Sequence, residues 1–501
     1  MEIHLDRESG TPLYRQIVTQ VIAHIEDGRL VVGTLLPPER KLAAQLDVNR
    51  TTVVTAYHDL VATGMVEARV GRGTWVSNAI MDGANPPQPV AWQTLFSGTM
   101  ERLREPVMRD MLAAMHHPNT ISFGAGAPSP EYFPVEQFRA AMDEALTTFG
   151  PELFVYGAVQ GWRPLRAALV EWMARGGIRS TAEQVVIFHG SQQGLDLIAR
   201  VLLEPGDAVV VESPTYLGAI QTFRGVGARL LPIALDREGI RIDLLEHVLA
   251  RYRPKFIYTL PTFQNPTGAT IPLVRRNALL DLAARYGVPI VEDDPYSALP
   301  YDGTPPPHLA ALDRRGLVIY LSTMSKTFLP GLRLGWMSAP PPVVEAVTLA
   351  RQTVDVHPNS AMQHVLHTFL TRGWLAEHIA AVRPIYAARR DAMLAALERM
   401  APPGMTWTEP AGGYFIWCRL PGGMRARALA TEAAREGVTF VSGEAFSPIG
   451  AERDAIRLNF TGVSEDAIIE GVRRLTTAVR RLSRDDTAGQ SETDTGARPV
   501  V

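Results

Sequence analysis

The stretch "STMSKTFLPGLRLGW", residues 322–336, decides the fold. It places Lys326 between hydroxyl residues, follows it with a Pro-Gly break and sets Arg333 seven residues beyond the lysine. A lysine amine is nucleophilic only when it is neutral, and a partly buried, cation-rich pocket lowers its pKa enough for this. Arginine and hydroxyl side chains are suited to binding phosphate. The stretch therefore predicts a reactive lysine beside a phosphate site, a combination that suggests pyridoxal phosphate.

Three further side chains are predicted to surround the ring of that cofactor. Pyridoxal phosphate acts as an electron sink only while its ring nitrogen is protonated, which calls for a buried carboxylate at a strand end. In "PIVEDDPYS", residues 289–297, Asp293 follows an apolar strand, and Tyr296 can hydrogen-bond the phenolic oxygen. "VESPTYLGA" brings Tyr216 into position to stack on the ring, and "PTFQNPTGAT" brings Asn265 to its edge.

A second phosphate arm is predicted in "FHGSQQGLDLIARVLLEPGD", residues 188–207. The pattern indicates a strand, a Gly-rich turn and a helix, so the amides of Ser191 and Gln192 can meet phosphate at a helix N-terminus. Each fragment alone is weak, because a lone lysine is usually a solvated surface group and a lone "NPTG" is usually a turn. Their occurrence in the correct order favours one cofactor site.

The chain divides into segments of different character. With 501 residues, 46% of them hydrophobic, it is too long for one simple core. Apolar β-rich runs alternate with helical stretches over residues 92–483, as is typical of an α/β domain with parallel strands and crossover helices. Residues 79–91, rich in Gly, Asn and Pro, are predicted to be a linker. Residues 484–501 are polar and are predicted to be a disordered tail.

Residues 1–78 are predicted to form helices followed by a hairpin. Thr11 is the expected N-cap of the first helix, with Pro12 at the first helical position. "MVEARVGRGTWVS" alternates residues around "GRG", as expected for a hairpin that exposes Arg72. A further helix, in "NRTTVVTAYHDLVATG", is predicted to start at an Asn49 cap and to carry one apolar face, made of Val53, Ala56, Tyr57, Leu60 and Val61.

This first segment resembles the winged helix-turn-helix domain of the GntR family of bacterial regulators. The motifs "PLYRQI", "LPPERKLAAQLDVNRTTV" and "GRGTWV" carry the match, and Pro38 and Asn49 stand where the family usually has serine. Such a helix pair can lay the start of its second helix in the DNA major groove. The alternative is a small helical domain whose arginines are merely solvated. The resemblance implies DNA contacts from Arg40, Arg50, Thr51, Thr52 and Arg72, with Gly71 and Gly73 letting the wing approach the minor groove.

The larger segment resembles the fold type I aminotransferases, and within them the branch of the α-aminoadipate and kynurenine aminotransferases. The match runs from "ISFGAGAPSPEYFP" to "IRLNFTGVSEDAIIEGVRRL". It implies an α/β fold with a mostly parallel sheet, crossover helices and a small C-terminal α+β subdomain. It also implies the following roles: Lys326 for the Schiff base, Asp293 for the ring nitrogen, Tyr216 for stacking, Asn265 and Tyr296 for the phenolic oxygen, Ser191, Gln192, Thr323, Ser325 and Arg333 for phosphate, Arg457, Gly126 and Asn265 for substrate, and Tyr156 for the substrate site of the neighbouring subunit.

The order of the two domains is that of the MocR subfamily of GntR-type regulators, which the chain resembles. The resemblance implies a homodimer that binds a double-stranded DNA operator and senses pyridoxal phosphate or an amino compound. The alternative is an active aminotransferase of the 2-aminoadipate or aromatic amino acid type with an appended DNA-binding domain. Transamination needs a lysine base, a carboxylate clamp and an ionised ring nitrogen, and Lys326, Arg457 and Asp293 are all present.

The bulk properties restrict where such a protein acts. The formal charge is −3, so DNA would have to be met by a local basic patch. The single cysteine, Cys418, lies in the apolar run "GGYFIWCRL" and is expected to be a buried structural thiol, and no metal site is predicted. No stretch approaches the roughly 20 apolar residues of a membrane span, and no signal peptide precedes the first helix. We expect a cytoplasmic protein.

Overall fold

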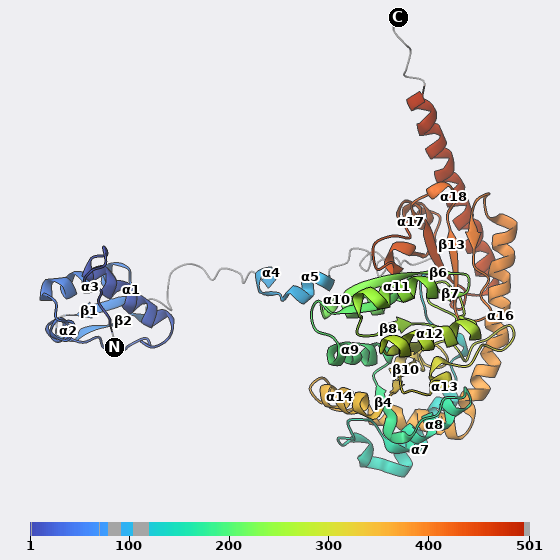
Figure 1. The fold of residues 1–501 in the computed structure, drawn as a ribbon, viewed down its shortest axis with the longest axis horizontal. Helices are drawn as coiled ribbons and strands as arrows, with labels where there is room; N and C mark the ends of the chain where they lie inside the picture. Colours follow the sequence, from blue (N-terminus) through green and yellow to red (C-terminus); the bar gives the residue numbers. More distant parts are fainter. Residues whose placement is uncertain (2, 70, 79–91, 104–119, 495–501) are drawn as a thin grey trace, which may run out of the picture. The chain divides into compact units, whose positions relative to one another are not determined.

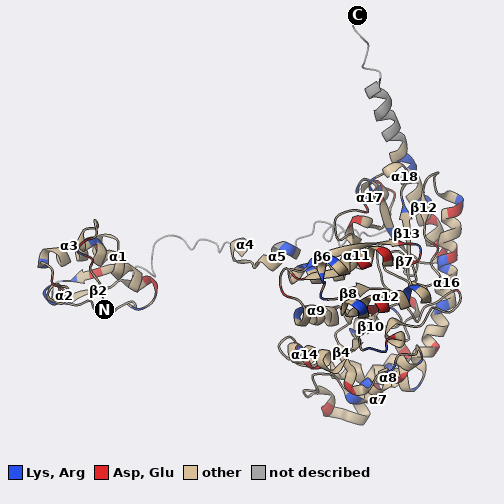
Figure 2. Ribbon diagram, viewed as in Figure 1, with Lys and Arg blue, Asp and Glu red and all other residues tan. Residues whose placement is uncertain are grey.

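The computed structural model describes residues 1, 3–69, 71–78, 92–103 and 120–494, with the backbone alone for 93, 101 and 484–494. These residues belong to two compact units, Met1–Leu95 and Phe96–Val501 (Figure 1). The predicted linker, residues 79–91, lies outside the described residues. Lys and Arg are interspersed with Asp and Glu on both units (Figure 2). No helix in the described part of the chain is long and apolar enough to cross a membrane.

The first unit contains the predicted helices and hairpin around a small apolar core. Asn49 caps the third helix by accepting a hydrogen bond from the Thr51 amide at 3.0 Å, which confirms the predicted cap. Pro12, not Thr11, is the N-cap of the first helix, so that helix starts one residue later than predicted. Val61 is 41% exposed and does not belong to the buried face. The elements are α1 (Leu13–Glu26), α2 (Glu39–Leu46), α3 (Arg50–Ala62), β1 (Val66–Arg69), β2 (Gly73–Val76) and α4 (Trp92–Leu95).

An eight-stranded sheet forms the centre of the second unit. Its five central strands run parallel, whereas β11 is antiparallel to both its neighbours and β7 is antiparallel to β6. The predicted mostly parallel α/β sheet is thus confirmed. In spatial order the strands are β4 (Val185–Phe188), β11 (Gly335–Ser338), β10 (Val318–Thr323), β9 (Ile290–Asp294), β8 (Ile257–Thr259), β5 (Ala208–Ser213), β6 (Arg229–Asp236) and β7 (Gly239–Ile240).

Helices cover both faces of this sheet (Figure 1). Val209 and Val211 of β5 point to the face that packs with α9, α10 and α14, whereas Val210 packs with α11 and α12 on the other face. This alternation is the two-residue period of a strand buried on both sides. The helices are α5 (Gly98–Leu103), α7 (Val135–Phe149), α8 (Arg163–Ala174), α9 (Ser191–Leu202), α10 (Leu217–Gly225), α11 (Ile242–Tyr252), α12 (Leu273–Tyr286), α13 (Leu309–Leu312), α14 (Pro341–Gln352), α15 (Ser360–Thr371) and α16 (Trp374–Met400).

The C-terminal part forms the predicted small α+β subdomain. It has an antiparallel sheet in the order β12-β13-β16-β15, and Cys418 on β13 is fully buried. Its helix α18 continues to Asp494, so residues 484–494 are helical, contrary to the predicted disordered tail. A helix already nucleated on packed residues extends at little cost into a polar sequence. The elements are β3 (Ile121–Ser122), β12 (Thr406–Trp407), β13 (Phe415–Arg419), α17 (Ala426–Arg435), β14 (Val438–Thr439), β15 (Val441–Ser442), β16 (Ala455–Asn459) and α18 (Glu465–Asp494).

Candidate cofactor site and nucleic-acid interface

One cavity of about 450 Å³ lies at the carboxyl ends of the central strands. Parallel strands deliver the residues that follow them to one edge of a sheet, where ligands bind in α/β folds. The structure brings together every predicted cofactor and substrate residue except Tyr156. These are Gly126, Ser191, Gln192, Tyr216, Asn265, Asp293, Tyr296, Thr323, Ser325, Lys326, Arg333 and Arg457.

Lys326 follows β10 and points its amine into this cavity. Its Nζ donates a hydrogen bond to the carbonyl of Gly126. Burial lowers the pKa of Lys326, and the positive charges of Arg457 and Arg333 lower it further, to about 8. The amine is therefore far more available as a nucleophile near neutral pH than an ordinary lysine.

Asp293, at the end of β9, has one carboxylate oxygen that accepts a hydrogen bond and one that has no partner among the described residues. Oδ2 accepts a hydrogen bond from the Tyr258 hydroxyl at 2.6 Å, whereas the buried Oδ1 has no hydrogen-bond partner among the described residues. Burial raises the pKa of Asp293 to about 7, and the Tyr258 hydrogen bond opposes that rise. A free carboxylate oxygen facing the cavity suits a protonated ring nitrogen. The sequence gives no sign of this role for Tyr258, because Tyr258 lies inside the apolar run of β8.

The phosphate arm is built from backbone and side chains at the start of α9. Gly190, with φ +82°, turns the chain so that the amides of Ser191 and Gln192 begin the helix. A Cβ at Gly190 would lie 2.5 Å from Nη2 of Arg333, so only glycine lets the arginine reach this turn. Arg333 Nη1 donates to Ser325 Oγ at 3.4 Å. Amides, a hydroxyl and a guanidinium therefore converge where a phosphate can bind.

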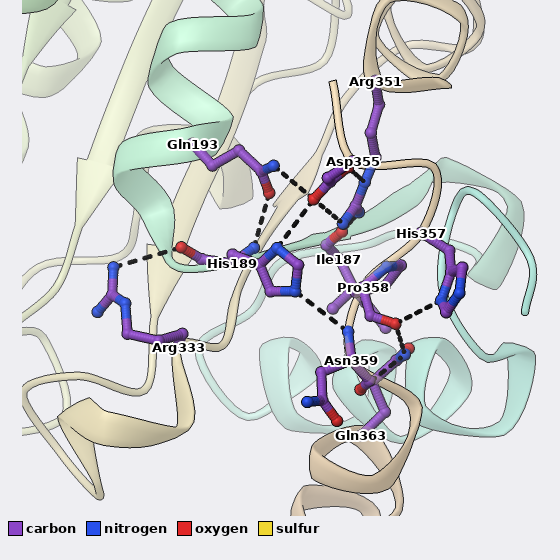
Figure 3. A network of polar contacts seen from close by, with 10 residues as sticks. All are labelled: Ile187, His189, Gln193, Arg333, Arg351, Asp355, His357, Pro358, Asn359 and Gln363. Carbon is purple, nitrogen blue, oxygen red and sulfur yellow. Dashed lines mark hydrogen bonds and ion pairs between the residues drawn. The ribbon is translucent and has the colours of Figure 1, made fainter. Parts of the chain in front are cut away.

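A polar network supports this arm from behind (Figure 3). His189 Nδ1 lies 2.8 Å from Asp355 Oδ2, and its Nε2 accepts a hydrogen bond from the Asn359 amide at 3.2 Å. Gln193 Nε2 and Arg351 Nε also donate to Asp355, at 2.6 and 3.0 Å. Burial raises the pKa of Asp355, but these donors outweigh it and the pKa falls. The sequence does not indicate this network, because it joins residues 189–193 to residues 351–359, two segments far apart along the chain.

Arg457, the predicted carboxylate clamp, lies in the wall of the same cavity. Its Nη1 donates to Asn265 Oδ1 at 3.1 Å and its Nη2 to the Gly124 carbonyl at 2.8 Å. Nε is buried without a hydrogen-bond partner in the described residues. The guanidinium lies 4.0 Å from the ring centroid of Phe415 and 4.7 Å from that of Phe446. Burial lowers its pKa to about 10, so it remains charged at neutral pH.

Tyr156 lies outside the cavity of its own chain. It is 85% exposed and packs edge-on against His357, with ring centroids 5.6 Å apart. Its expected role at a neighbouring subunit's site stays a prediction.

The candidate DNA face lies at the start of α3 and at the hairpin turn. Arg50 opens α3 and forms an ion pair with Glu39, with Nη2 3.1 Å from Oε2, which the sequence analysis did not anticipate. Thr51 is exposed, and its hydroxyl donates to Asn49 Oδ1 at 2.9 Å, whereas Thr52 is half-buried. The other predicted contacts are all exposed, namely Arg40, Gly71, Arg72 and Gly73.

Comparisons with known proteins match both units. The family model for aminotransferase class I and II matches residues 118–475, and that for bacterial regulatory proteins of the gntR family matches residues 13–76. The chain is 40% identical to the aromatic-amino-acid aminotransferase 1 of Thermococcus litoralis over 395 residues, 78% of this chain and 95% of that protein. The solved kynurenine aminotransferase of Pyrococcus horikoshii has a TM-score of 0.75 and 40% identity, covering 78% of this chain and 98% of that one.

A further relative spans both units. The chain is 31% identical over 485 residues to the probable rhizopine catabolism regulatory protein MocR of Rhizobium meliloti, covering 95% of this chain and 96% of that protein. The larger unit is thus a class I and II aminotransferase domain, and its cavity fits pyridoxal phosphate, the cofactor of that class. The chain belongs to the MocR-type regulators of the GntR family, in which a helix-turn-helix domain precedes such a domain.

Covalent attachment of the cofactor should depend on pH through Lys326. A lysine with a pKa of about 8 is protonated below that pH and neutral above it. The attachment rate of pyridoxal phosphate to apoprotein is expected to rise with pH and level off slightly above 8, as followed by absorbance after mixing. A rate that keeps rising towards pH 10.5, the ordinary lysine value, would contradict the lowered pKa.

Tyr258→Phe should weaken cofactor binding. Loss of the hydroxyl raises the pKa of Asp293 further, so less of the carboxylate is ionised to hold the ring-nitrogen proton. We expect the Kd for pyridoxal phosphate, measured by titrating apoprotein, to rise about ten-fold. Tyr301→Phe is the matched control, because the hydroxyl of this tyrosine donates to the Gly413 carbonyl, outside the cavity. Equal effects in both variants would indicate general destabilisation.

Proposed function

We propose that this protein is a transcriptional regulator that binds operator DNA through its winged helix and senses pyridoxal phosphate or an amino compound in its aminotransferase-like cavity. The observation that carries the proposal is the exposed set at the start of α3 and on the hairpin, in a chain that also has a complete cofactor cavity. Backbone amides and arginines at a helix start bind DNA phosphates, and exposed side chains there reach base edges.

Each residue of the cavity has a separate task in this proposal. Arg457, buried and charged, binds the carboxylate of an amino acid, and its unpartnered Nε leaves it a free donor. Lys326 holds the cofactor and can exchange a proton near neutral pH. Asp293 keeps the ring nitrogen protonated through its free oxygen. The cofactor, when bound, supplies the electron-sink chemistry of its class.

An enzymatic role is the second candidate. Lys326, Asp293 and Arg457 are the base, the ring-nitrogen partner and the clamp that transamination needs, and all three line the one cavity. This favours a working aminotransferase of the 2-aminoadipate or aromatic amino acid type, and it is compatible with regulation. In either case the natural amino compound must present a carboxylate to Arg457.

The proposal also covers the oligomeric state of the protein and its location in the cell. We place the protein in the cytoplasm as a homodimer, in which two DNA-binding units engage two half-sites. Paired half-sites give a dimer its operator geometry, and a short linker restricts the permitted spacing. A ligand alters DNA binding only if it binds two arrangements of the dimer with different affinity.

Arg50→Ala is expected to weaken specific DNA binding by about 1–3 kcal/mol, because Arg50 opens the helix that enters the groove. The measurement is the Kd at fixed salt for an operator selected from random-sequence DNA by the unmodified protein. Arg29→Ala is the control, since Arg29 is exposed, ion-paired with Asp27 and outside the predicted contact set. Equal operator affinity of Arg50→Ala and the unmodified protein would remove Arg50 from the interface.

Lys326→Ala should abolish the covalent link that borohydride traps, while the phosphate arm still holds the cofactor weakly. Mass spectrometry after borohydride treatment reads the link directly. The unmodified protein is then mixed with a panel of amino acids and a 2-oxo acid. Repeated 2-oxo acid production establishes an aminotransferase, whereas an absorbance change that alters operator affinity without turnover establishes a sensor. A trapped adduct in Lys326→Ala would contradict the assignment.

A further inference from the structure

The end of β9 and the residues that follow it face two different cavities. Asp293 and Tyr296 line the cofactor cavity, whereas Ser297 lines a second cavity of about 620 Å³. Asp294 is linked to the second cavity through Ser297. Its Oδ1 accepts a hydrogen bond from the Ser297 amide at 3.0 Å, and its Oδ2 accepts one from the Ser297 hydroxyl at 2.5 Å. The second cavity lies between the end of α8, the loop before α13 and the start of α16, which neighbour one another in Figure 1.

A charged histidine stands in the wall of the second cavity. His308 Nδ1 lies 3.6 Å from both Glu292 Oε1 and Asp294 Oδ2, which is within ion-pair range but too long for a hydrogen bond. Burial lowers the pKa of His308, as does nearby Arg276, but the two carboxylates outweigh them and raise it to about 9. The ring is therefore an imidazolium at neutral pH. Among the described residues, the buried Nδ1 has no hydrogen-bond partner, and no hydrogen bond to Nε2 is found there either.

The rest of the lining is cationic and apolar. Arg175 and Arg383 line the cavity with His308, and no aspartate or glutamate is among the described residues of the lining. Arg383 uses Nε to donate to the Pro300 carbonyl at 3.0 Å, and Arg175 lies 5.2 Å from the ring centroid of Trp172. The remaining walls are formed largely by Met173, Ile178, Ala376, Ile379 and the three prolines 305–307.

We propose that this second cavity binds a small organic acid, with its carboxylate at His308 and the two arginines and its apolar body against the surrounding walls. A charged, unpartnered N–H donor in a cavity without acidic lining attracts an anion. The extensive apolar wall favours a carboxylate with an aromatic or branched body over inorganic phosphate. This site lies beyond the proposed function, and it does not depend on DNA binding or on turnover.

The position of the second cavity allows a ligand bound there to influence the cofactor site. A ligand held by His308 acts on Asp294 and Ser297, which alternate with Asp293 and Tyr296 along one short segment. A displacement of this segment changes the carboxylate that holds the cofactor's ring nitrogen. The second ligand and the cofactor can therefore alter one another's affinity, and such coupling is reciprocal.

The test uses the full-length protein loaded with cofactor, and phenylacetate as the probe. Phenylacetate has a carboxylate and an apolar body but no amino group to react with the cofactor. Because Arg457 can also bind its carboxylate, calorimetric titrations are made on an Arg457→Gln background. We expect one binding event to remain there, and phenylacetamide, which lacks the charge, to bind at least about ten-fold more weakly.

Two variants on that background locate the event. His308→Gln removes the cation, and Ala380→Phe fills the cavity from the exposed side of α16. Each should weaken phenylacetate binding at least about ten-fold. Ala381→Phe, exposed on the same helix but outside the lining, should leave it unchanged. Ala380→Phe keeps the test decisive if His308→Gln does not fold. Loss of all binding on the Arg457→Gln background, or full binding by Ala380→Phe, would overturn the proposal.

Discussion

At one edge of its central sheet, the larger unit gathers more positive than negative charge, and the way this excess is compensated constrains the rest of the unit. Lys326, Arg333 and Arg457 face the cofactor cavity against the single carboxylate of Asp293. Like charges brought together out of water destabilise a fold unless an opposite charge joins them. A phosphate and a substrate carboxylate supply the missing negative charge, so ligands of this class should stabilise the folded unit as well as occupy it. The geometry of the parallel sheet makes this concentration of charge possible, because successive strands deliver their polar residues to one place.

The supports behind the cavity explain how such a site keeps its shape. His189 directly precedes the Gly190 turn of the phosphate arm, and its ring contacts Asp355. The Asp355 carboxylate also accepts hydrogen bonds from Gln193 and Arg351. This network ties the start of α9 to the segment between α14 and α15 (Figure 3). That segment also carries His357, against which the exposed Tyr156 packs. A displacement of the phosphate arm can therefore be passed through this network to the exposed surface around Tyr156 and His357.

Site residues can be predicted from this sequence where function requires a residue at a strand end or at a helix start. Lys326, Asp293 and Asn265 follow apolar strands, so their placement in one cavity could be predicted once the strands were assumed parallel. Tyr258 could not be found this way, because its role depends on β8 lying beside β9, and a tyrosine inside an apolar run resembles an ordinary core residue. The pair between Arg50 and Glu39 joins two helices across a turn and is likewise a property of the fold alone. The helix through Asp494 differs from the predicted tail because composition does not record the packed turns that precede it.

The buried thiol of Cys418 has a practical consequence for anyone who wishes to watch the two units move. It is the chain's one cysteine, it is fully buried, and burial raises its pKa well above the ordinary range. A thiol in this state is a poor nucleophile and reacts slowly with maleimides or nitroxide reagents. Fluorophores or spin labels can therefore be attached to cysteines engineered on each unit without first removing the native one. The distance between the units, with and without ligand or DNA, then becomes accessible to spectroscopy in solution.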